Sequence, residues 1–293
     1  MNKIINLLLI NLSIVLSSSL CWGNQDVMVP PHNACVKNIS ESSTPIADIK
    51  KCEKVAQSTI NRNEKAKALL FLGRMHLQLP NALMYRFFSA PSSKYFEGEK
   101  KFKTFCKTRP NEYYSDEVSG SYIYNGHHFN TIIAAYSETE FVDDAAFEIA
   151  KLPQGGECEG WLDCYLENPL KPLCAFLKKY PYSPLAKDAV STANLILKNT
   201  LDMWLGEIKT PINYKVPSEG YNPDAIKTTL HNYEDSLSKL QKEDRVSAYM
   251  AIASAWSRLT YYSEAKLLYL SILKEISEHD GAKKALKNLP AGK

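Results

Sequence analysis

The sequence predicts an all-α protein of stacked helical hairpins, an α-solenoid, with an irregular insertion that contains cysteine and glycine. The first observation is a corner motif that occurs twice, as YSETEFVDDAA at 136–146 and YPYSPLAKDAV at 180–190. The second is that small Ala145 and Ala189 fall at equivalent positions, where they allow two helices to lie close together. The third is a pattern of large and small side chains between 249 and 269. A repeated helix–turn–helix corner is typical of stacked hairpins.

The two corners align at an offset of 44, with Tyr136 on Tyr180. In each copy we expect one helix to end at the tyrosine and a second to begin at a hydroxyl residue. Thr139 and Ser183 are the expected N-caps, because a side-chain oxygen can accept hydrogen bonds from the free N–H groups of a first turn. Pro184 would then occupy the first helical position, where its missing N–H costs nothing.

The first 23 residues predict a secretory signal peptide. Lys3 is followed by an apolar run from 4 to 20 and by small Gly23. Leu20 before Cys21 departs from the pattern of lipoprotein signals, so an outer-membrane lipoprotein is the less favoured interpretation. No later segment approaches membrane-spanning length. We therefore expect a soluble mature chain that is periplasmic or secreted.

Six cysteines remain after the predicted cleavage, and an oxidising compartment favours disulfides among them. The glycines between 155 and 160 give that loop freedom to close, so Cys158 and Cys164 are the expected local disulfide. The other connectivities stay open, because six cysteines can pair in about 15 ways.

Apolar residues at spacings of three and four predict the helices of an N-terminal helical-repeat module, 24–208. These helices are 45–60, 63–79, 84–88, 96–106, 127–136, 140–151, 172–180 and 183–204. Pro80 is expected to end the second helix. The alternation at 121–124 fits a short strand, but no partner strand follows it, so Asn125-Gly126 is interpreted as a turn leading into a helix.

A proline- and glycine-containing stretch, 209–223, is the predicted linker. A C-terminal helical module, 224–293, is predicted beyond it, with helices at 224–240, 244–259, 263–276 and 281–289. Within it, Ala253 and Ala265 are the expected contact points of two antiparallel helices, and Trp256 is expected in the core.

These patterns resemble tetratricopeptide-repeat proteins of the bacterial envelope, chiefly over 129–198 and 246–289. The corner is similar to the YPxSxxAxxA signature of two families, the lipoprotein of the outer-membrane barrel-assembly machinery and the Tol-Pal coordinating protein. Leu72-Gly73 with His76 is similar to a first-helix signature of the repeat. The corners lie 44 residues apart, where the usual period is about 34. The resemblance implies concave helical surfaces that bind peptides or proteins without catalysis.

The sequence predicts no catalytic, cofactor-binding or metal-binding residues. Gly-x-Ser-x-Gly, Gly-rich phosphate-loop and His-Glu-x-x-His motifs are all missing, and a net charge of +3 does not favour nucleic acid. One weaker alternative is a metal site formed by His127, His128, Glu157, Glu159, Asp163 and the two cysteines of the expected disulfide. Zinc sites favour cysteines two to four residues apart, whereas five residues separate these, and export favours their oxidation.

Four tyrosines form the candidate partner-binding group: Tyr113, Tyr114, Tyr122 and Tyr124. If exposed, they would supply large contact area at a low entropic cost. The competing interpretation is that half of them belong to the core. His76 lies on the apolar face of its predicted helix and is expected to be a packed histidine.

The leading expectation is an exported scaffold or adaptor, not an enzyme, that binds envelope proteins or peptides in the periplasm. The first alternative is a secreted enzyme or virulence factor with a pocket built by the insertions at 81–126 and 155–166. The second is a cell-wall or small-molecule binding protein that uses the tyrosines. The sequence does not indicate the oligomeric state.

Overall fold

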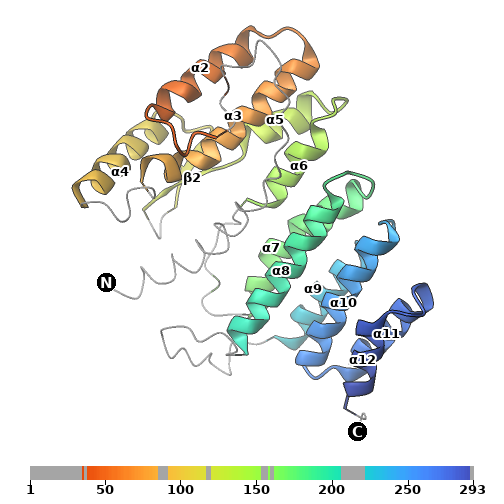
Figure 1. Cartoon of the computed structure of the whole chain (residues 1–293). Helices are drawn as coiled ribbons and strands as arrows, with labels where there is room; N and C mark the ends of the chain where they lie inside the picture. Colours follow the sequence, from red (N-terminus) through yellow and green to blue (C-terminus); the bar gives the residue numbers. More distant parts are fainter. Residues whose placement is uncertain are drawn as a thin grey trace. The chain divides into compact units, whose positions relative to one another are not determined.

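The computed structural model describes residues 35, 38–84, 92–116, 120–152, 158, 162–205 and 222–290. Over these residues the chain is predominantly helical with one two-stranded sheet, which confirms the predicted all-α class (Figure 1). The chain divides into two compact units, an N-terminal unit within Asp26–Gly155 and a C-terminal unit within Gly156–Lys293. The predicted signal peptide lies outside the described residues. Among the helices described, none combines the length and apolarity needed to cross a membrane.

The N-terminal unit is arranged around its longest helix, α3, which packs against α2, α4 and α5, while α6 packs on α5 (Figure 1). Its helices are α2 (Pro45–Ser58), α3 (Arg62–Leu83), α4 (Ser92–Lys107), α5 (His127–Ala135) and α6 (Val142–Ala150), and its strands are β1 (Tyr113–Ser115) and β2 (Tyr122–Tyr124). The predicted helix at 84–88 falls almost entirely outside the described residues.

Helix α3 begins at a conventional cap, because the Asn61 side chain accepts a hydrogen bond from the Glu64 N–H. Gly73 lets α5 approach closely, since a Cβ at that position would lie 2.4 Å from the Phe129 ring. The prediction that Pro80 ends the helix is wrong. Pro80 lies in the last turn, and its carbonyl accepts from the Met84 N–H.

The hairpin β1–β2 corrects the expectation that 122–124 has no strand partner. The partner precedes it in sequence, and the two strands pair antiparallel with Tyr113 opposite Tyr124. The Asn125-Gly126 turn still leads directly into α5, as predicted. Gly126 has a φ of 78°, and a Cβ there would lie 2.4 Å from the Ile149 side chain, so both conformation and packing require glycine.

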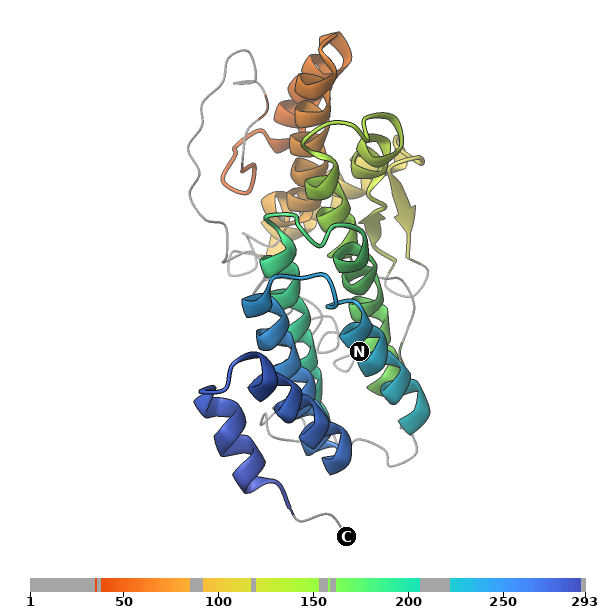
Figure 2. The same cartoon turned by 90° about the vertical axis from the view of Figure 1, so that its right-hand side faces the viewer.

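Six helices form the described part of the C-terminal unit, and they stack on one another (Figure 2). These are α7 (Leu162–Lys179), α8 (Ala186–Trp204), α9 (Pro223–Asp235), α10 (Lys242–Arg258), α11 (Tyr262–Glu275) and α12 (Asp280–Asn288). Helix α7 packs against α8 and α9, α8 against α10, α10 against α11, and α11 against α12.

The compact units differ from the predicted modules. Because α9 and α10 pack directly on α7 and α8, the stretch 209–223 does not separate two modules. The division falls instead between Gly155 and Gly156, and 206–221 lies outside the described residues.

Helix α7 is longer than predicted, since it begins at Leu162 and not at Pro172. It contains both Pro169 and Pro172, each of which disfavours a helix interior by about 3 kcal/mol. Leucines at helical spacing bury one face of this helix and offset that cost. They are Leu162, Leu166, Leu170, Leu173 and Leu177.

The two corner motifs have the same backbone hydrogen bonds, which confirms the relation that the sequence predicts. In both, four N–H groups donate to carbonyls at matching positions 44 residues apart. In the first corner, the N–H groups of Tyr136, Thr139, Val142 and Ala145 donate in turn to the carbonyls of Ile132, Tyr136, Thr139 and Phe141. In the second corner, the N–H groups of Tyr180, Ser183, Ala186 and Ala189 donate in turn to the carbonyls of Phe176, Tyr180, Ser183 and Leu185. Ala145 and Ala189 are fully buried.

The expected N-caps of these corners are wrong, because the N-cap positions are Phe141 and Leu185, two residues after Thr139 and Ser183. The second helices begin at Val142 and Ala186, and neither has a side-chain cap. The Thr139 hydroxyl donates back to the Tyr136 carbonyl, while Ser183 Oγ accepts from the Leu185 N–H inside the turn. Two successive backbone turns therefore come before each helix.

Candidate functional site

The candidate site is a buried polar cluster in the N-terminal unit formed by His76, Glu112 and His128, here called the His–Glu–His cluster. The hairpin positions two of its members, because Glu112 comes directly before β1 and His128 lies in the first turn of α5 after β2. The Asn125 N–H donates to the Glu112 carbonyl, which holds the two ends of the hairpin together. His76 comes from the core face of α3.

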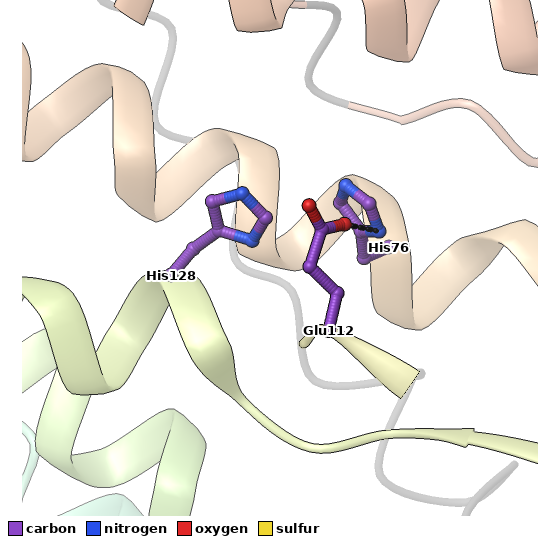
Figure 3. Close-up of side chains that lie close together, drawn as sticks. All are labelled: His76, Glu112 and His128. Atoms are coloured by element: carbon purple, nitrogen blue, oxygen red, sulfur yellow. Dashed lines mark ion pairs between the residues drawn. The ribbon is translucent and has the colours of Figure 1, made fainter. Parts of the chain in front are cut away.

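One donor atom from each of the three side chains lies within 4.8 Å of the other two. Figure 3 shows the Glu112 carboxylate between the two imidazole rings. His76 Nδ1 is 3.6 Å from Glu112 Oε2, and the ring centroids of His76 and His128 are 4.8 Å apart. His76 is fully buried, His128 is 6% exposed, and the Glu112 side chain is 19% exposed.

A tyrosine hydroxyl anchors one nitrogen of each histidine. His76 Nδ1 lies 2.7 Å from the Tyr113 hydroxyl, and His128 Nδ1 lies 2.8 Å from the Tyr124 hydroxyl. The Tyr124 oxygen also accepts from the His128 backbone N–H. Two buried atoms of the cluster, His76 Nε2 and Glu112 Oε2, have no hydrogen bond within the described part of the chain, although Glu112 Oε2 is in an ion pair with Arg109 at 3.5 Å.

Burial shifts the protonation of all three side chains towards the neutral forms. It lowers the pKa of His76 well below its ordinary value and that of His128 to about 3, and the nearby positive charge of Arg109 acts in the same direction. Burial raises the pKa of Glu112, although Arg109 opposes this. Arg109 is itself paired with Glu53, at 2.8 Å. The histidines are therefore neutral at pH 7, with nitrogen lone pairs available to a Lewis acid.

Two imidazoles and one carboxylate are a donor set that zinc and other transition metals bind in proteins. Three donors 4.8 Å apart would leave a central ion about 2.8 Å (4.8/√3) from each, whereas zinc ligands lie about 2.0–2.2 Å from the ion. Shifts of less than about 1 Å in each side chain would close the difference.

The four tyrosines do not form one exposed patch. Tyr113 and Tyr124 are 3% and 5% exposed and belong to the core around the cluster, Tyr122 is half-buried, and Tyr114 is 40% exposed. Alternation along the paired strands sends Tyr113 and Tyr124 to the same buried side. Half of the group is thus core, and a partner surface built on all four is wrong.

The expected local disulfide is confirmed, because the sulfurs of Cys158 and Cys164 are 2.07 Å apart. Their thiolates are therefore not free to complete a metal site with His127 and His128. Glu157 and Glu159 lie outside the described residues, as does half of the insertion at 155–166, so a pocket there stays a prediction.

A second disulfide joins Cys35 to Cys52. Cys106 and Cys174 are buried free thiols, and burial raises their pKa values to about 12 and about 11. The six cysteines are thus two disulfides and two protonated thiols.

The sequence interpretation missed the His–Glu–His cluster. Its members are 36 and 16 residues apart, which fits no ligand motif. The available signal was His76 on an apolar helix face, correctly predicted as buried, but its polar partners come from a hairpin whose pairing was not predicted.

The chain matches no known protein family, no curated protein and no solved structure.

Proposed function

We propose that the protein is an exported interaction module, a tetratricopeptide-like scaffold or adaptor that binds envelope proteins or peptides in the periplasm. The observation that carries the proposal is the corner of 136–146 and 180–190, which recurs with the same backbone hydrogen bonds. Proteins built from such hairpins present extended helical surfaces suited to binding other chains. The stack from α7 to α12 supports this role.

Export has separate support from the cysteines. Two pairs lie at disulfide distance, and stable disulfides are typical of compartments outside the reducing cytosol. Intact-mass analysis of the protein from cell fractions tests this. We expect a chain that begins near Gly23, carries two disulfides and is found in the periplasm or medium. A cytosolic chain with an intact N-terminus would contradict export.

Binding is tested by crosslinking in intact cells, followed by reconstitution of the complex from purified components. We expect a protein or peptide of the envelope to bind the folded chain with a defined stoichiometry and without being chemically altered. An unrelated exported helical protein serves as the comparison bait. The adaptor proposal fails if every molecule captured by the chain is also captured by the comparison bait, or if the bound molecule is converted to product.

A matched pair of variants links binding to the hairpin. Ala189→Leu overfills the contact between α7 and α8, since Ala189 is fully buried. Asp188→Ala changes an exposed neighbour on the same helix. We expect the first variant to weaken partner binding at least tenfold and the second to leave it unchanged.

A further inference from the structure

We propose that His76, Glu112 and His128 form a binding site for a divalent transition-metal ion, with Zn²⁺ as the preferred ion. The site lies in the core of the N-terminal unit, and the proposal is independent of the adaptor role. Its basis is a donor set of two imidazoles and one carboxylate whose donor atoms already lie within 4.8 Å of one another.

The unpaired atoms favour a ligand over a closed hydrogen-bond network. His76 Nε2 and Glu112 Oε2 are buried without a hydrogen bond, and buried polar atoms in folded proteins are nearly always paired. Whichever tautomer His76 adopts, the contact of Nδ1 with the Tyr113 hydroxyl leaves Nε2 unsatisfied. A metal ion coordinated by His76 Nε2 would satisfy that nitrogen, and one coordinated by Glu112 Oε2 would satisfy that oxygen.

The surrounding residues resemble the outer shell of a metal site. Histidine ligands of metals usually donate their second N–H to an oxygen, which fixes the ring and raises its basicity. Here Tyr113 and Tyr124 place hydroxyl oxygens 2.7 and 2.8 Å from the two Nδ1 atoms. The rings are thus held by groups that would remain after an ion had bound.

Charge and access are also consistent with one divalent ion. Arg109 forms an ion pair with Glu112 Oε2 at 3.5 Å and a shorter one with Glu53 at 2.8 Å, so Arg109 would keep a carboxylate partner if Glu112 turned to an ion. Zinc is usually four-coordinate, so a water molecule or an anionic group would supply the fourth ligand, as in three-ligand zinc sites. Glu112 is the partly exposed member, which places the open position on its side.

The experiment uses the oxidised, full mature chain, stripped with EDTA and dialysed, with Zn²⁺ alone as the probe. Isothermal titration calorimetry and elemental analysis should show one ion per chain, and Zn²⁺ should raise the melting temperature of the stripped protein, because ligands that bind the folded state stabilise it. The test variant is Glu112→Gln, which keeps the shape of the side chain but removes its negative charge and one acceptor oxygen. Its affinity for Zn²⁺ should fall by more than the roughly 10–100-fold that loss of an outer-shell partner costs.

Two controls separate this site from other binding. His127→Gln changes the exposed neighbour of His128, and Cys106→Ala removes the nearest free thiol in the same unit; both should retain wild-type affinity. Circular dichroism in EDTA confirms that each variant is folded. The proposal is overturned if the wild-type chain binds no Zn²⁺, if Glu112→Gln binds as tightly as wild type, or if Cys106→Ala alone loses the ion.

Discussion

Glu148 is a buried carboxylate held between two cations in the N-terminal unit. Its side chain is 4% exposed, with Arg74 Nε at 2.8 Å and Lys151 Nζ at 2.9 Å. Burial alone would raise the pKa of Glu148, but Lys151 and Arg74 together outweigh burial and lower it. Because Arg74 belongs to α3 and Glu148 to α6, this ion pair links two helices that are distant in sequence.

A lowered pKa in the folded state makes stability depend on pH in a defined direction. The contribution of Glu148 is present above the pKa of an unfolded glutamate, about 4.3, and is lost as pH falls through the lower folded value. We expect Glu148→Gln to destabilise the N-terminal unit by about 3 kcal/mol at pH 7, and by much less at pH 3. Urea unfolding at both pH values measures this. Glu140→Gln, at an exposed position before α6, should have no effect, and an equal loss for Glu148→Gln at both pH values would contradict the argument.

Individual residues were predicted well where helical spacing alone decides their position. Ala145, Ala189, Ala253, Ala265 and Trp256 are all buried as expected. The positions of Glu112 and the tyrosines were not predicted, because they depend on which strand pairs with 122–124. That pairing is a non-local contact, and spacing along the chain does not reveal it.

At the scale of elements, the connection between α10 and α11 is a Schellman motif with an unfavourable residue. The Thr260 N–H donates to the Ser257 carbonyl and the Tyr261 N–H to the Trp256 carbonyl, which is the bonding pattern of that motif. Thr260 has a φ of 68°. This left-handed conformation suits glycine and strains a β-branched residue.

Thr260→Gly should therefore stabilise the C-terminal unit, by about 0.5–1 kcal/mol, since relief of strain exceeds the entropy that glycine loses on folding. Thr260 is exposed, so no packing is lost. The measurement is the midpoint of chemical unfolding. Ser254→Gly, at an exposed position inside α10, should destabilise by about 0.5 kcal/mol, and a loss of stability for Thr260→Gly would refute the strain argument.

Helix boundaries were predicted to within two residues in α2, α10, α11 and α12, where apolar spacing alone decides them. They were missed where core packing outweighs local preference. In α7, Pro169 and Pro172 argue for a helix that starts later, yet the buried leucine face continues through both. The prolines can be read directly from the sequence, but the contacts that the leucines make cannot.

At the scale of the whole molecule, each disulfide lies in a different compact unit. Cys35–Cys52 spans 17 residues in the N-terminal unit, and Cys158–Cys164 spans 6 in the C-terminal unit.

The all-α fold class was predictable because helical periodicity covers most of the chain. The division into compact units at 155–156 was not predicted, because the proline-rich stretch at 209–223 resembles a linker more closely than 155–156 does.

Replacing each cystine by two serines should affect only its own unit. Loop-closure entropy predicts a loss of about 3 kcal/mol for the Cys35→Ser/Cys52→Ser variant and about 2 kcal/mol for Cys158→Ser/Cys164→Ser. Hydrogen exchange resolved by peptide reports on the two units separately. Faster exchange in both units after either replacement would show that their stabilities are coupled.

The short spacing of both cystines bears on how the chain matures. A polypeptide that crosses a membrane unfolded emerges from its N-terminus, and Cys35 would meet Cys52 before any later thiol had arrived. Cys158 has its partner only 6 residues further along the chain, but the free thiol of Cys106 precedes both. If the chain is exported as proposed, the first cystine can form in order of emergence, whereas correct formation of the second requires that Cys106 is already buried.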